Sequence, residues 1–404
     1  INNGQLDRTL GAENLITKEL LKYDNVRLYS FRCNSELICN LDNYKDAKHY
    51  GEWVNSQMLQ WMKNDEYRIT EENLAEYEKN ADDRRPMAST TKIATAITVI
   101  DNVSDLDKTV VVPDCAVGVE GSSIYLQKGE TATVRDLLYG LMLQSGNDCA
   151  VALAVTTAGN VEKFAALMNE TARKCGANDT NFVTPHGLHD DNHFTTARDL
   201  ATISAYAMKN PVFREIVSTK RHVMPWAGHD YDRVILNKNK ILSTFDGGNG
   251  IKTGYTKKAG RCLVSSATRN GMTVISVVLN CGPMFEECRT LMERAFDEYS
   301  LVDVSAIAPN VECATVDSPS STVVLRPNEK TLYPMTDSER NSLEFGTKNV
   351  SAVRGGTKKG SENGKICVTL EKRLLFELKL YTIEDVGTLP VRDILYRIAG
   401  EWNG

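Results

Sequence analysis

The chain has no long apolar run, no excess of charge of one sign and no internal repeat. No stretch approaches the roughly 18 apolar residues that a membrane-spanning helix needs. The 47 basic and 53 acidic residues leave a net charge of −6, and no basic patch is interleaved with aromatic residues. Nucleic-acid binding is therefore not expected. A chain of 404 residues has ample length for two domains.

The ten cysteines include no C-x-x-C pair, which argues against a zinc ribbon or a dithiol redox motif. We interpret them first as scattered buried thiols, as at Cys149, where a small buried residue fits best. One or two disulfides stay open, and the nearest candidates in the sequence are Cys33–Cys39 and Cys281–Cys288.

Three short motifs follow one another along the chain. Ser89-Thr90-Thr91-Lys92 fits S-x-x-K, and Ser145-Gly146-Asn147 and Lys252-Thr253-Gly254 come after it. Alone, each motif has an ordinary explanation: a serine that caps a helix, a turn, and the end of a strand. In this order they form the set that β-lactamases and penicillin-binding proteins share. The set predicts a serine that D-Ala-D-Ala-like substrates and penicillin acylate.

Ser89 and Lys92 have the spacing of a nucleophile and its base. A serine hydroxyl needs a neighbouring base to take its proton. Residues 89–100 contain no glycine or proline and predict a helix, in which Ser89 and Lys92 share one face about one turn apart. Burial and a nearby cation such as Lys252 lower the pKa of a lysine, so Lys92 is the predicted base. The N–H of Ser89 is the first predicted oxyanion donor.

The second motif follows an apolar run over residues 137–143, which should be buried. Ser145 and Asn147 would then lie at the end of that run and face a cleft. We expect Ser145 to pass a proton to the leaving amine and Asn147 to hold the amide of the substrate.

The third motif lies in residues 250–256, which read as a strand at the edge of a sheet. Lys252 and Thr253 are predicted to bind a terminal carboxylate. Gly254 is expected to let the backbone of the substrate lie close to the strand. The N–H of Tyr255 is the predicted second oxyanion donor.

Further segments resemble low-molecular-mass penicillin-binding proteins of the serine D-Ala-D-Ala carboxypeptidase family. The resemblance is close over about residues 74–300 and loose over the next 90, and its segments are 77–92, 117–123, 185–188, 195–200 and 246–255. It implies an enzyme that trims the terminal D-Ala from peptidoglycan stem peptides, is acylated by β-lactams and uses no cofactor. It also implies roles in the cell wall and cell shape, and export to the outer face of the cytoplasmic membrane. The sequence shows no signal peptide, and its start reads as processed, so export rests on the resemblance.

The family implies an α+β fold with a penicillin-binding/β-lactamase-like catalytic domain, made of an antiparallel sheet and a helical half, over residues 1–300. A small β-rich domain is expected over 301–388, where short β-type runs alternate with polar loops. Residues 130–220 read mostly as helices. Arg269-Asn270-Gly271, between two apolar runs, predicts a hairpin of the sheet.

Both ends of the chain are less typical. Residues 25–40 fit a first hairpin with a turn at Asn34-Ser35, and 41–73 read as an inserted helical segment. We favour a packed surface insertion for that segment over a cleft rim or a partner-binding element. Residues 389–404 place apolar side chains on one helical face, which predicts either peripheral membrane attachment through an amphipathic helix or packing on the second domain.

His186, His189 and His193 are spaced by three and four residues, which resembles a metal site. The same stretch also matches an ordinary loop of the family, and serine acylation needs no metal. We therefore predict no metal.

Two other functions compete with the carboxypeptidase. A class A-like β-lactamase shares the three motifs but needs a glutamate in an E-x-x-L-N context to activate water. None of Glu162, Glu170 and Glu215 has that context, and Gly146 stands where those enzymes usually have aspartate. A non-catalytic β-lactam receptor or wall-binding protein is disfavoured because such a binder has no need of all three motifs.

Overall fold

The computed structural model describes residues 28–29, 68–69, 80–226 and 228–393. Strand β1 (Leu28–Tyr29) pairs antiparallel with β2 (Arg68–Ile69). The second arm of the predicted first hairpin, at residues 37–39, lies outside the described residues. So do the Cys33–Cys39 pair, most of the predicted insertion, and residues 394–404 at the end of the chain.

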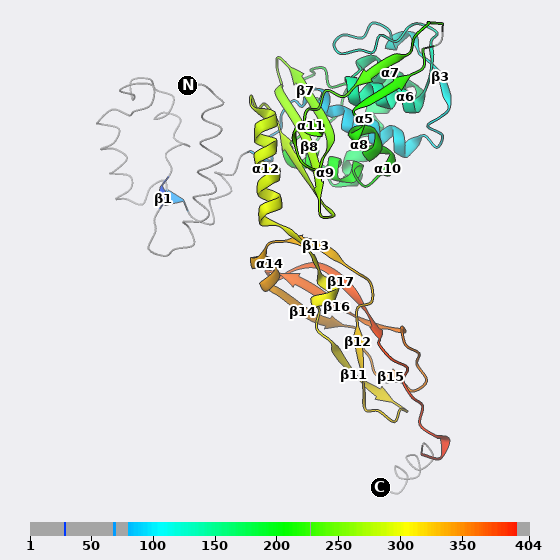
Figure 1. Ribbon diagram of the computed structural model, residues 1–404, viewed down its shortest axis with the longest axis vertical. Helices are drawn as coiled ribbons and strands as arrows, with labels where there is room; N and C mark the ends of the chain where they lie inside the picture. The colour runs from blue at the N-terminus through cyan, green and yellow to red at the C-terminus, as the bar shows by residue number, and fades with distance from the viewer. Residues whose placement is uncertain (1–27, 30–67, 70–79, 227, 394–404) are drawn as a thin grey trace, which may run out of the picture. The chain divides into compact units, whose positions relative to one another are not determined.

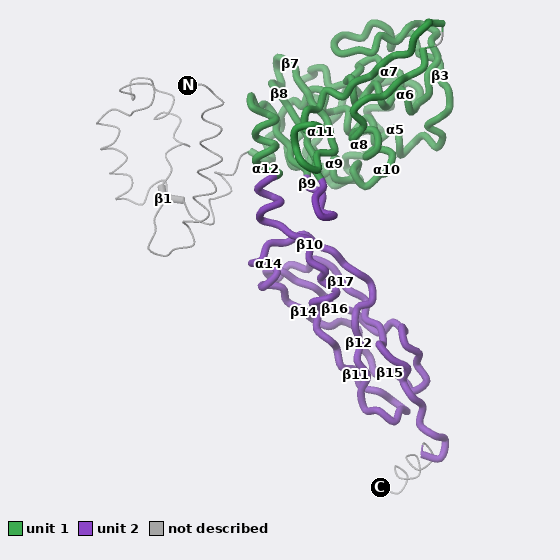
Figure 2. Tube along the Cα trace, in the orientation of Figure 1, with its two compact units in different colours: residues 1–267, 275–292 green, residues 268–274, 293–404 purple. Residues whose placement is uncertain are grey.

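Two compact units divide the chain (Figure 2). The first comprises residues 1–267 and 275–292, and the second comprises 268–274 and 293–404. The domain boundary that the sequence places at residue 300 stays a prediction. No helix in the described part of either unit has the length and apolar character to cross a membrane.

The helical half of the first unit is built around α5 (Lys92–Asn102), whose first eight residues, 92–99, are all buried. Helices cover it because their amphipathic faces need a common core. Threonine or asparagine caps begin α6, α8, α9 and α10, each accepting a backbone N–H of the first turn. These helices, with the π-helical turn η4, are α6 (Val134–Tyr139), η4 (Gly140–Gln144), α7 (Asn147–Ala158), α8 (Val161–Cys175), α9 (Ala197–Ala207) and α10 (Pro211–Ser218). The prediction that residues 130–220 are mostly helical is confirmed.

A three-stranded sheet has the order β7-β8-β9, so β7 is an edge strand, as the sequence predicted (Figure 1). Its strands are β7 (Gly248–Thr256), β8 (Gly260–Arg269) and β9 (Met272–Val278). Asn270 and Gly271 join β8 to β9 with φ values of 50° and 81°. These left-handed conformations are those that the Asn-Gly hairpin turn requires, so the hairpin prediction is confirmed.

Smaller elements accompany the helical half and the three-stranded sheet. Two short antiparallel pairs flank the helical half, and helix α12 follows the sheet. These elements are β3 (Thr109–Val111) with β4 (Thr131–Thr133), η3 (Asp114–Ala116), β5 (Arg221–Met224) with β6 (Arg233–Leu236), α11 (Ile241–Thr244) and α12 (Met284–Glu298).

The second unit is β-rich, with a six-stranded sheet in the order β14-β16-β17-β12-β11-β15 and a separate pair β10-β13. Its core includes Leu325, Ile366 and Leu380. Its elements are β10 (Ser300–Asp303), α13 (Val304–Ile307), β11 (Val311–Val316), β12 (Thr322–Arg326), β13 (Leu332–Met335), α14 (Asp337–Asn341), β14 (Leu343–Lys348), β15 (Val353–Arg354), β16 (Glu362–Leu370) and β17 (Arg373–Thr382). The predicted α+β class with a β-rich C-terminal part is confirmed.

Candidate active site

Ser89 lies in a tight 3₁₀ turn, η2 (Ala88–Thr91), that leads directly into α5. Its predecessor Ala88 has a left-handed φ of 49°, which is strained for a residue with a Cβ. Thr90 Oγ1 and Thr91 Oγ1 donate to the carbonyls of Met87 and Ala88, at 2.6 and 2.8 Å. The turn that carries Ser89 is therefore fixed by side chains as well as by its backbone.

Lys92 is fully buried, and its Nζ meets polar atoms from three separate segments. Nζ lies 3.1 Å from Ser89 Oγ, 2.7 Å from Asn147 Oδ1 and 2.7 Å from the carbonyl oxygen of His186. The sequence predicted the first contact, whereas for Asn147 it predicted a role in the site but no bond to Lys92. The third partner is a backbone oxygen, which a pattern of side chains in the sequence cannot predict.

The pKa of Lys92 is held well below its usual range. Burial is the main cause, because a charged amine loses its hydration in the interior. The positive charge of Lys252 adds to the effect, and that of Lys238 contributes further. Burial and a nearby cation are the causes that the sequence analysis proposed.

The turn after η4 presents Ser145 to the site. Ser145 is left-handed, with φ 66° and ψ 34°, and it is nearly buried at 5% exposure. Gly146 N donates to the carbonyl of Gly140 at 3.1 Å, which closes the turn. A Cβ on Gly146 would lie 2.7 Å from Asp148 Oδ1 and 2.9 Å from Cys149 Sγ, so the turn has no room for a side chain here.

Asn147 is held from both sides of its amide. Its Oδ1 accepts from Lys92, and its Nδ2 donates to the carbonyl of Glu120. Its backbone N donates to the carbonyl of Ser122 at 2.7 Å. The predicted contact with the substrate amide would use the second Nδ2 hydrogen or the second lone pair of Oδ1, because one hydrogen and one lone pair already have partners.

Lys252 is buried on β7, and burial followed by the charge of Lys238 lowers its pKa to about 7. Its Nζ donates to the carbonyl of Thr253 at 3.1 Å. Thr253 is half-buried and Tyr255 is 65% exposed. The prediction for Tyr255 concerns its backbone N–H and does not depend on this exposed side chain.

Gly254 also makes a close approach within the chain itself. A Cβ on Gly254 would lie 3.1 Å from the backbone N of Ser89, and equally close to Thr90 N and Met87 O. An added Cβ would therefore press β7 against the turn that carries Ser89. This contact lies within the chain, and the expected approach of a substrate backbone to Gly254 stays a prediction.

The loop after α8 closes the site from the other side. Gly187 has a φ of 84°, and a Cβ there would lie 2.0 Å from the carbonyl oxygen of Ala88. His186 places its carbonyl on Lys92, while its Nδ1 accepts from the N–H of Leu188 at 3.2 Å. His186 thus contributes to the site through its backbone.

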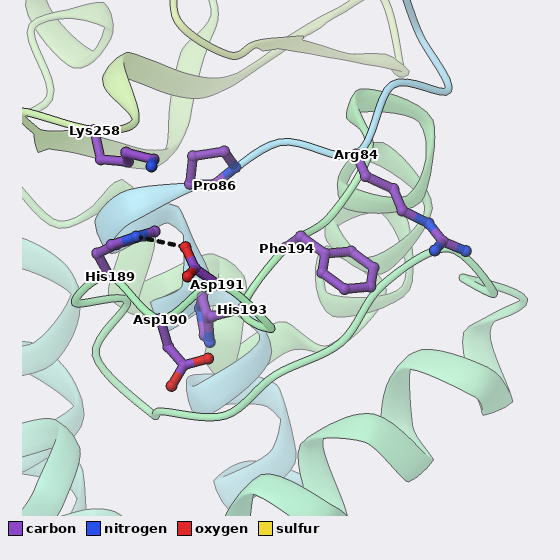
Figure 3. A pocket seen from close by; sticks show the side chains of 8 residues that line it. All are labelled: Arg84, Pro86, His189, Asp190, Asp191, His193, Phe194 and Lys258. Carbon is purple, nitrogen blue, oxygen red and sulfur yellow. Dashed lines mark ion pairs between the residues drawn. The ribbon is translucent and has the colours of Figure 1, made fainter.

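The three histidines do not converge on one point. His189 forms an ion pair with Asp191 at 3.1 Å (Figure 3). Both ring nitrogens of His193 already have hydrogen-bond partners. Among the described residues no cluster of three or more histidine, cysteine or carboxylate side chains could hold a metal ion.

A pocket beside this loop contains none of the predicted site residues. It is lined by Arg84, Pro86, His189, Asp190, Asp191, His193, Phe194 and Lys258 (Figure 3).

The buried thiol of Cys288 is free, so the Cys281–Cys288 disulfide is not formed.

Lys238 is the site residue that the sequence analysis missed. Its Nζ donates to the carbonyl of Gln144 at 3.0 Å, next to Ser145, and its charge lowers the pKa of both Lys92 and Lys252. A single lysine in a polar stretch has no spacing that marks it. Only the fold brings it to the motifs.

Comparison with known proteins points to one enzyme family. A family model described as D-alanyl-D-alanine carboxypeptidase matches residues 16–282. The chain is 26% identical over 338 residues to the D-alanyl-D-alanine carboxypeptidase DacF of Bacillus subtilis, which covers 81% of this chain and 86% of that protein. It is 38% identical over 218 residues to the D-alanyl-D-alanine carboxypeptidase of Streptomyces sp. K15, covering 50% of this chain and 75% of that one. Penicillin binding protein 5 from Haemophilus influenzae superposes with a TM-score of 0.58 at 27% identity, over 76% of this chain and 92% of its own.

Proposed function

The chain belongs to the D-alanyl-D-alanine carboxypeptidase family, and on that basis we propose that Ser89 is its nucleophile and Lys92 its general base. The protein is a serine-type carboxypeptidase that removes the terminal D-Ala from peptidoglycan stem peptides and is acylated by β-lactams. The observation that supports the two roles is the 3.1 Å contact between Lys92 Nζ and Ser89 Oγ inside a buried site.

A neutral Lys92 has two N–H groups and one lone pair. The two N–H groups match the two acceptors at 2.7 Å, Asn147 Oδ1 and the His186 carbonyl. The lone pair then faces Ser89 Oγ, the third neighbour. In this arrangement Lys92 accepts the hydroxyl proton of Ser89 as the oxygen attacks the carbonyl carbon between the two D-Ala residues.

Attack by Ser89 Oγ forms a tetrahedral intermediate whose negative oxygen needs two donors. The backbone N–H groups of Ser89 and Tyr255 supply them in this proposal. They come from two segments whose backbones touch, since Gly254 lies against Ser89. The C–N bond then breaks, and the proton taken by Lys92 reaches the amine of the leaving D-Ala through Ser145. Water hydrolyses the acyl-enzyme and regenerates Ser89.

The terminal carboxylate of the substrate is bound by Lys252 and Thr253. A pKa of about 7 for Lys252 leaves part of the population protonated at neutral pH, and an arriving carboxylate favours the protonated form. Gly254 keeps β7 close to Ser89, so the carboxylate and the reacting carbonyl are set at a fixed separation.

The β-lactamase alternative lacks a base for deacylation. Among the described residues no glutamate side chain hydrogen-bonds with Ser89, Lys92 or Asn147. Glu215 instead accepts from Tyr139 Oη at 2.9 Å, away from these three. A penicillin acyl group on Ser89 is therefore expected to persist.

The family acts on the cell wall, and we propose that this protein is exported and acts at the outer face of the cytoplasmic membrane. A catalytic domain over residues 1–300 and a β-rich domain over 301–388 form part of the same proposal, as does peripheral membrane attachment through residues 389–404.

Intact-protein mass spectrometry after incubation with benzylpenicillin tests the assignment. We expect one persistent adduct on the wild type and none on Ser89→Ala. Ser243→Ala, which changes an exposed serine on α11, serves as the matched control and should be labelled like the wild type. An adduct on Ser89→Ala would refute the nucleophile, and rapid loss of penicillin without an adduct would favour a β-lactamase.

A further inference from the structure

His193 is a buried histidine that the proposed chemistry does not use. It is 3% exposed, and its ring packs edge-on against Phe182 with the ring centroids 5.8 Å apart. It projects from the loop that lines the pocket toward the segment that carries Ser89 (Figure 3). A buried polar ring with fixed partners on both nitrogens has a single orientation.

The hydrogen bonds of His193 define its tautomer. Nδ1 accepts from the backbone N–H groups of Val183 and Thr184, at 3.0 and 3.3 Å, so it bears no proton. The neutral ring therefore has its proton on Nε2, which lies 2.8 Å from Thr91 Oγ1. Burial keeps the ring neutral by lowering its pKa to about 4.

Thr91 passes this orientation on. Because its Oγ1 accepts from His193 Nε2–H, its own hydrogen is directed to the carbonyl of Ala88, 2.8 Å away. Gly187 packs on the same carbonyl, where even a Cβ would not fit. The Ala88 carbonyl is thus fixed by a directed donor and by a close steric contact.

The Ala88 carbonyl and the Ser89 N–H belong to one planar peptide group. In a trans peptide the two bonds point in opposite directions, so fixing the carbonyl also fixes the N–H. Ala88 is left-handed, which is a strained conformation that its surroundings must hold in place. Rotation of this peptide plane would swing the Ser89 N–H away from the oxyanion.

We propose that His193 is a positioning residue that, through Thr91, holds the Ala88–Ser89 peptide plane so that the Ser89 N–H points at the oxyanion. The proposal rests on the proposed function, because it takes Ser89 N–H as an oxyanion donor. It assigns no contact between His193 and the substrate. The effect of His193 is therefore on the transition state for acylation and not on binding of the ground state.

Two matched pairs of variants test the proposal. Thr91→Val removes the hydroxyl at nearly constant shape, and Thr91→Ser retains it. His193→Asn keeps an acceptor near the position of Nδ1 but has no donor that reaches Thr91, whereas His193→Gln places an N–H near the position of Nε2. The readouts are the acylation rate constant with benzylpenicillin, the non-covalent affinity that precedes acylation, and the affinity for a peptide boronic acid that becomes tetrahedral on Ser89.

We expect Thr91→Val and His193→Asn to acylate about 10- to 100-fold more slowly, since losing one oxyanion donor outright costs about 100- to 1,000-fold. Boronic acid affinity should fall by the same factor, with the non-covalent affinity unchanged. Thr91→Ser and His193→Gln should stay within about threefold of the wild type. The double variant Thr91→Val/His193→Asn should be no slower than the worse single variant, because both changes break one chain of hydrogen bonds.

Acylation of Thr91→Val and His193→Asn at the wild-type rate would overturn the proposal. The proposal would also be overturned if all four single variants lost acylation rate equally and in proportion to a fall in melting temperature, because a purely structural role would give that pattern. Labelling of the wild type at Ser89 is read separately in the same experiment. Labelling at Ser89 tests the proposed nucleophile, and the acylation rates of the variants test only the role of His193.

Discussion

Gly254 of β7 lies against the backbone of Ser89, so closely that a Cβ on Gly254 would be 3.1 Å from Ser89 N. This contact joins the sheet to the turn that carries the nucleophile. It brings the Lys-Thr-Gly motif and the Ser-x-x-Lys motif together through backbone atoms. One predicted oxyanion donor, the N–H of Ser89, belongs to the turn, and the other, the N–H of Tyr255, belongs to the residue after Gly254 on β7.

Gly254→Ala should push β7 away from this turn by a few tenths of an ångström. We expect a loss of about 1–3 kcal/mol in the free energy of unfolding from overpacking, and acylation by benzylpenicillin slower by about 10-fold or more. Urea denaturation and stopped-flow acylation measure the two effects. Gly282→Ala, where an added Cβ meets nothing within 4 Å, is the control and should change neither.

Lys238→Met should shift the pH dependence of the enzyme. Lys252 has a pKa of about 7, lowered by burial and by the charge of Lys238, and in the proposed function its protonated form binds the carboxylate of the substrate. Removing the Lys238 charge raises the pKa of Lys252, so the fall of kcat/KM at alkaline pH should move to higher pH. The pH profile of D-Ala release measures this. Lys128→Met, which removes an exposed lysine paired with Asp114, should leave the profile in place, and an unmoved limb in Lys238→Met would contradict the coupling.

Gly187→Ala should be among the most damaging single changes in the first unit. Its Cβ would lie 2.0 Å from the Ala88 carbonyl oxygen, and its φ of 84° is strained for alanine. We expect a loss of more than about 3 kcal/mol in the free energy of unfolding, together with loss of acylation. Gly118→Ala has a similar φ of 73° with open space around it, so it separates backbone strain, about 1 kcal/mol, from the clash. Similar losses in both variants would argue against the clash.

Arg233→Met should loosen the loop that holds Asn147. Arg233 and Glu130 form a buried ion pair, with side chains 7% and 3% exposed, and Arg233 Nη2 also donates to the carbonyl of Tyr125 at 3.0 Å. Leaving Glu130 buried without its partner costs about 3–5 kcal/mol. Thermal unfolding should show this loss. The exposed pair of Lys128 and Asp114 should contribute at most about 1 kcal/mol when broken, and an equal effect of the two pairs would count against burial as the cause.

Acid should destabilise the first unit through His193. Its pKa is about 4 in the fold, with burial outweighing the opposing charge of Asp190, and about 6.5 when unfolded. The folded state therefore binds fewer protons, so this stabilisation is present above pH 6.5 and is lost as pH falls toward 4. Between pH 7 and 5 the loss is about 2 kcal/mol, and His193→Gln should remove it from a urea titration series. A series as steep as that of the wild type would show that His193 does not titrate in this way.

The parts of the site that sequence predicted are those where spacing along the chain determines contact. Ser89 and Lys92 are three residues apart in a helical segment, so their meeting at 3.1 Å follows from helix geometry. The Asn270-Gly271 turn likewise needs only local conformational preference. The resemblance to a known family supplied the order of the three motifs and the second, β-rich part.

The parts that sequence missed depend on contacts between distant segments. The His186 carbonyl on Lys92, the packing of Gly254 on Ser89 and the charge of Lys238 join residues separated by many tens of positions. Two of these contacts use backbone atoms, which every residue type offers equally. No residue pattern can distinguish them, so only the folded chain identifies the partners.

Lys92 enters folding as an ordinary ammonium group and ends in an interior that disfavours its proton. Folding of the helical half therefore weakens proton binding by Lys92, and this opposes folding wherever the unfolded chain holds that proton. The surroundings that lower the pKa of Lys92 are formed once, when the chain folds, and each catalytic cycle returns Lys92 to them. Conditions that loosen the packing around α5 would let the amine regain its proton, so this enzyme should lose its reactivity toward penicillin before it loses its secondary structure.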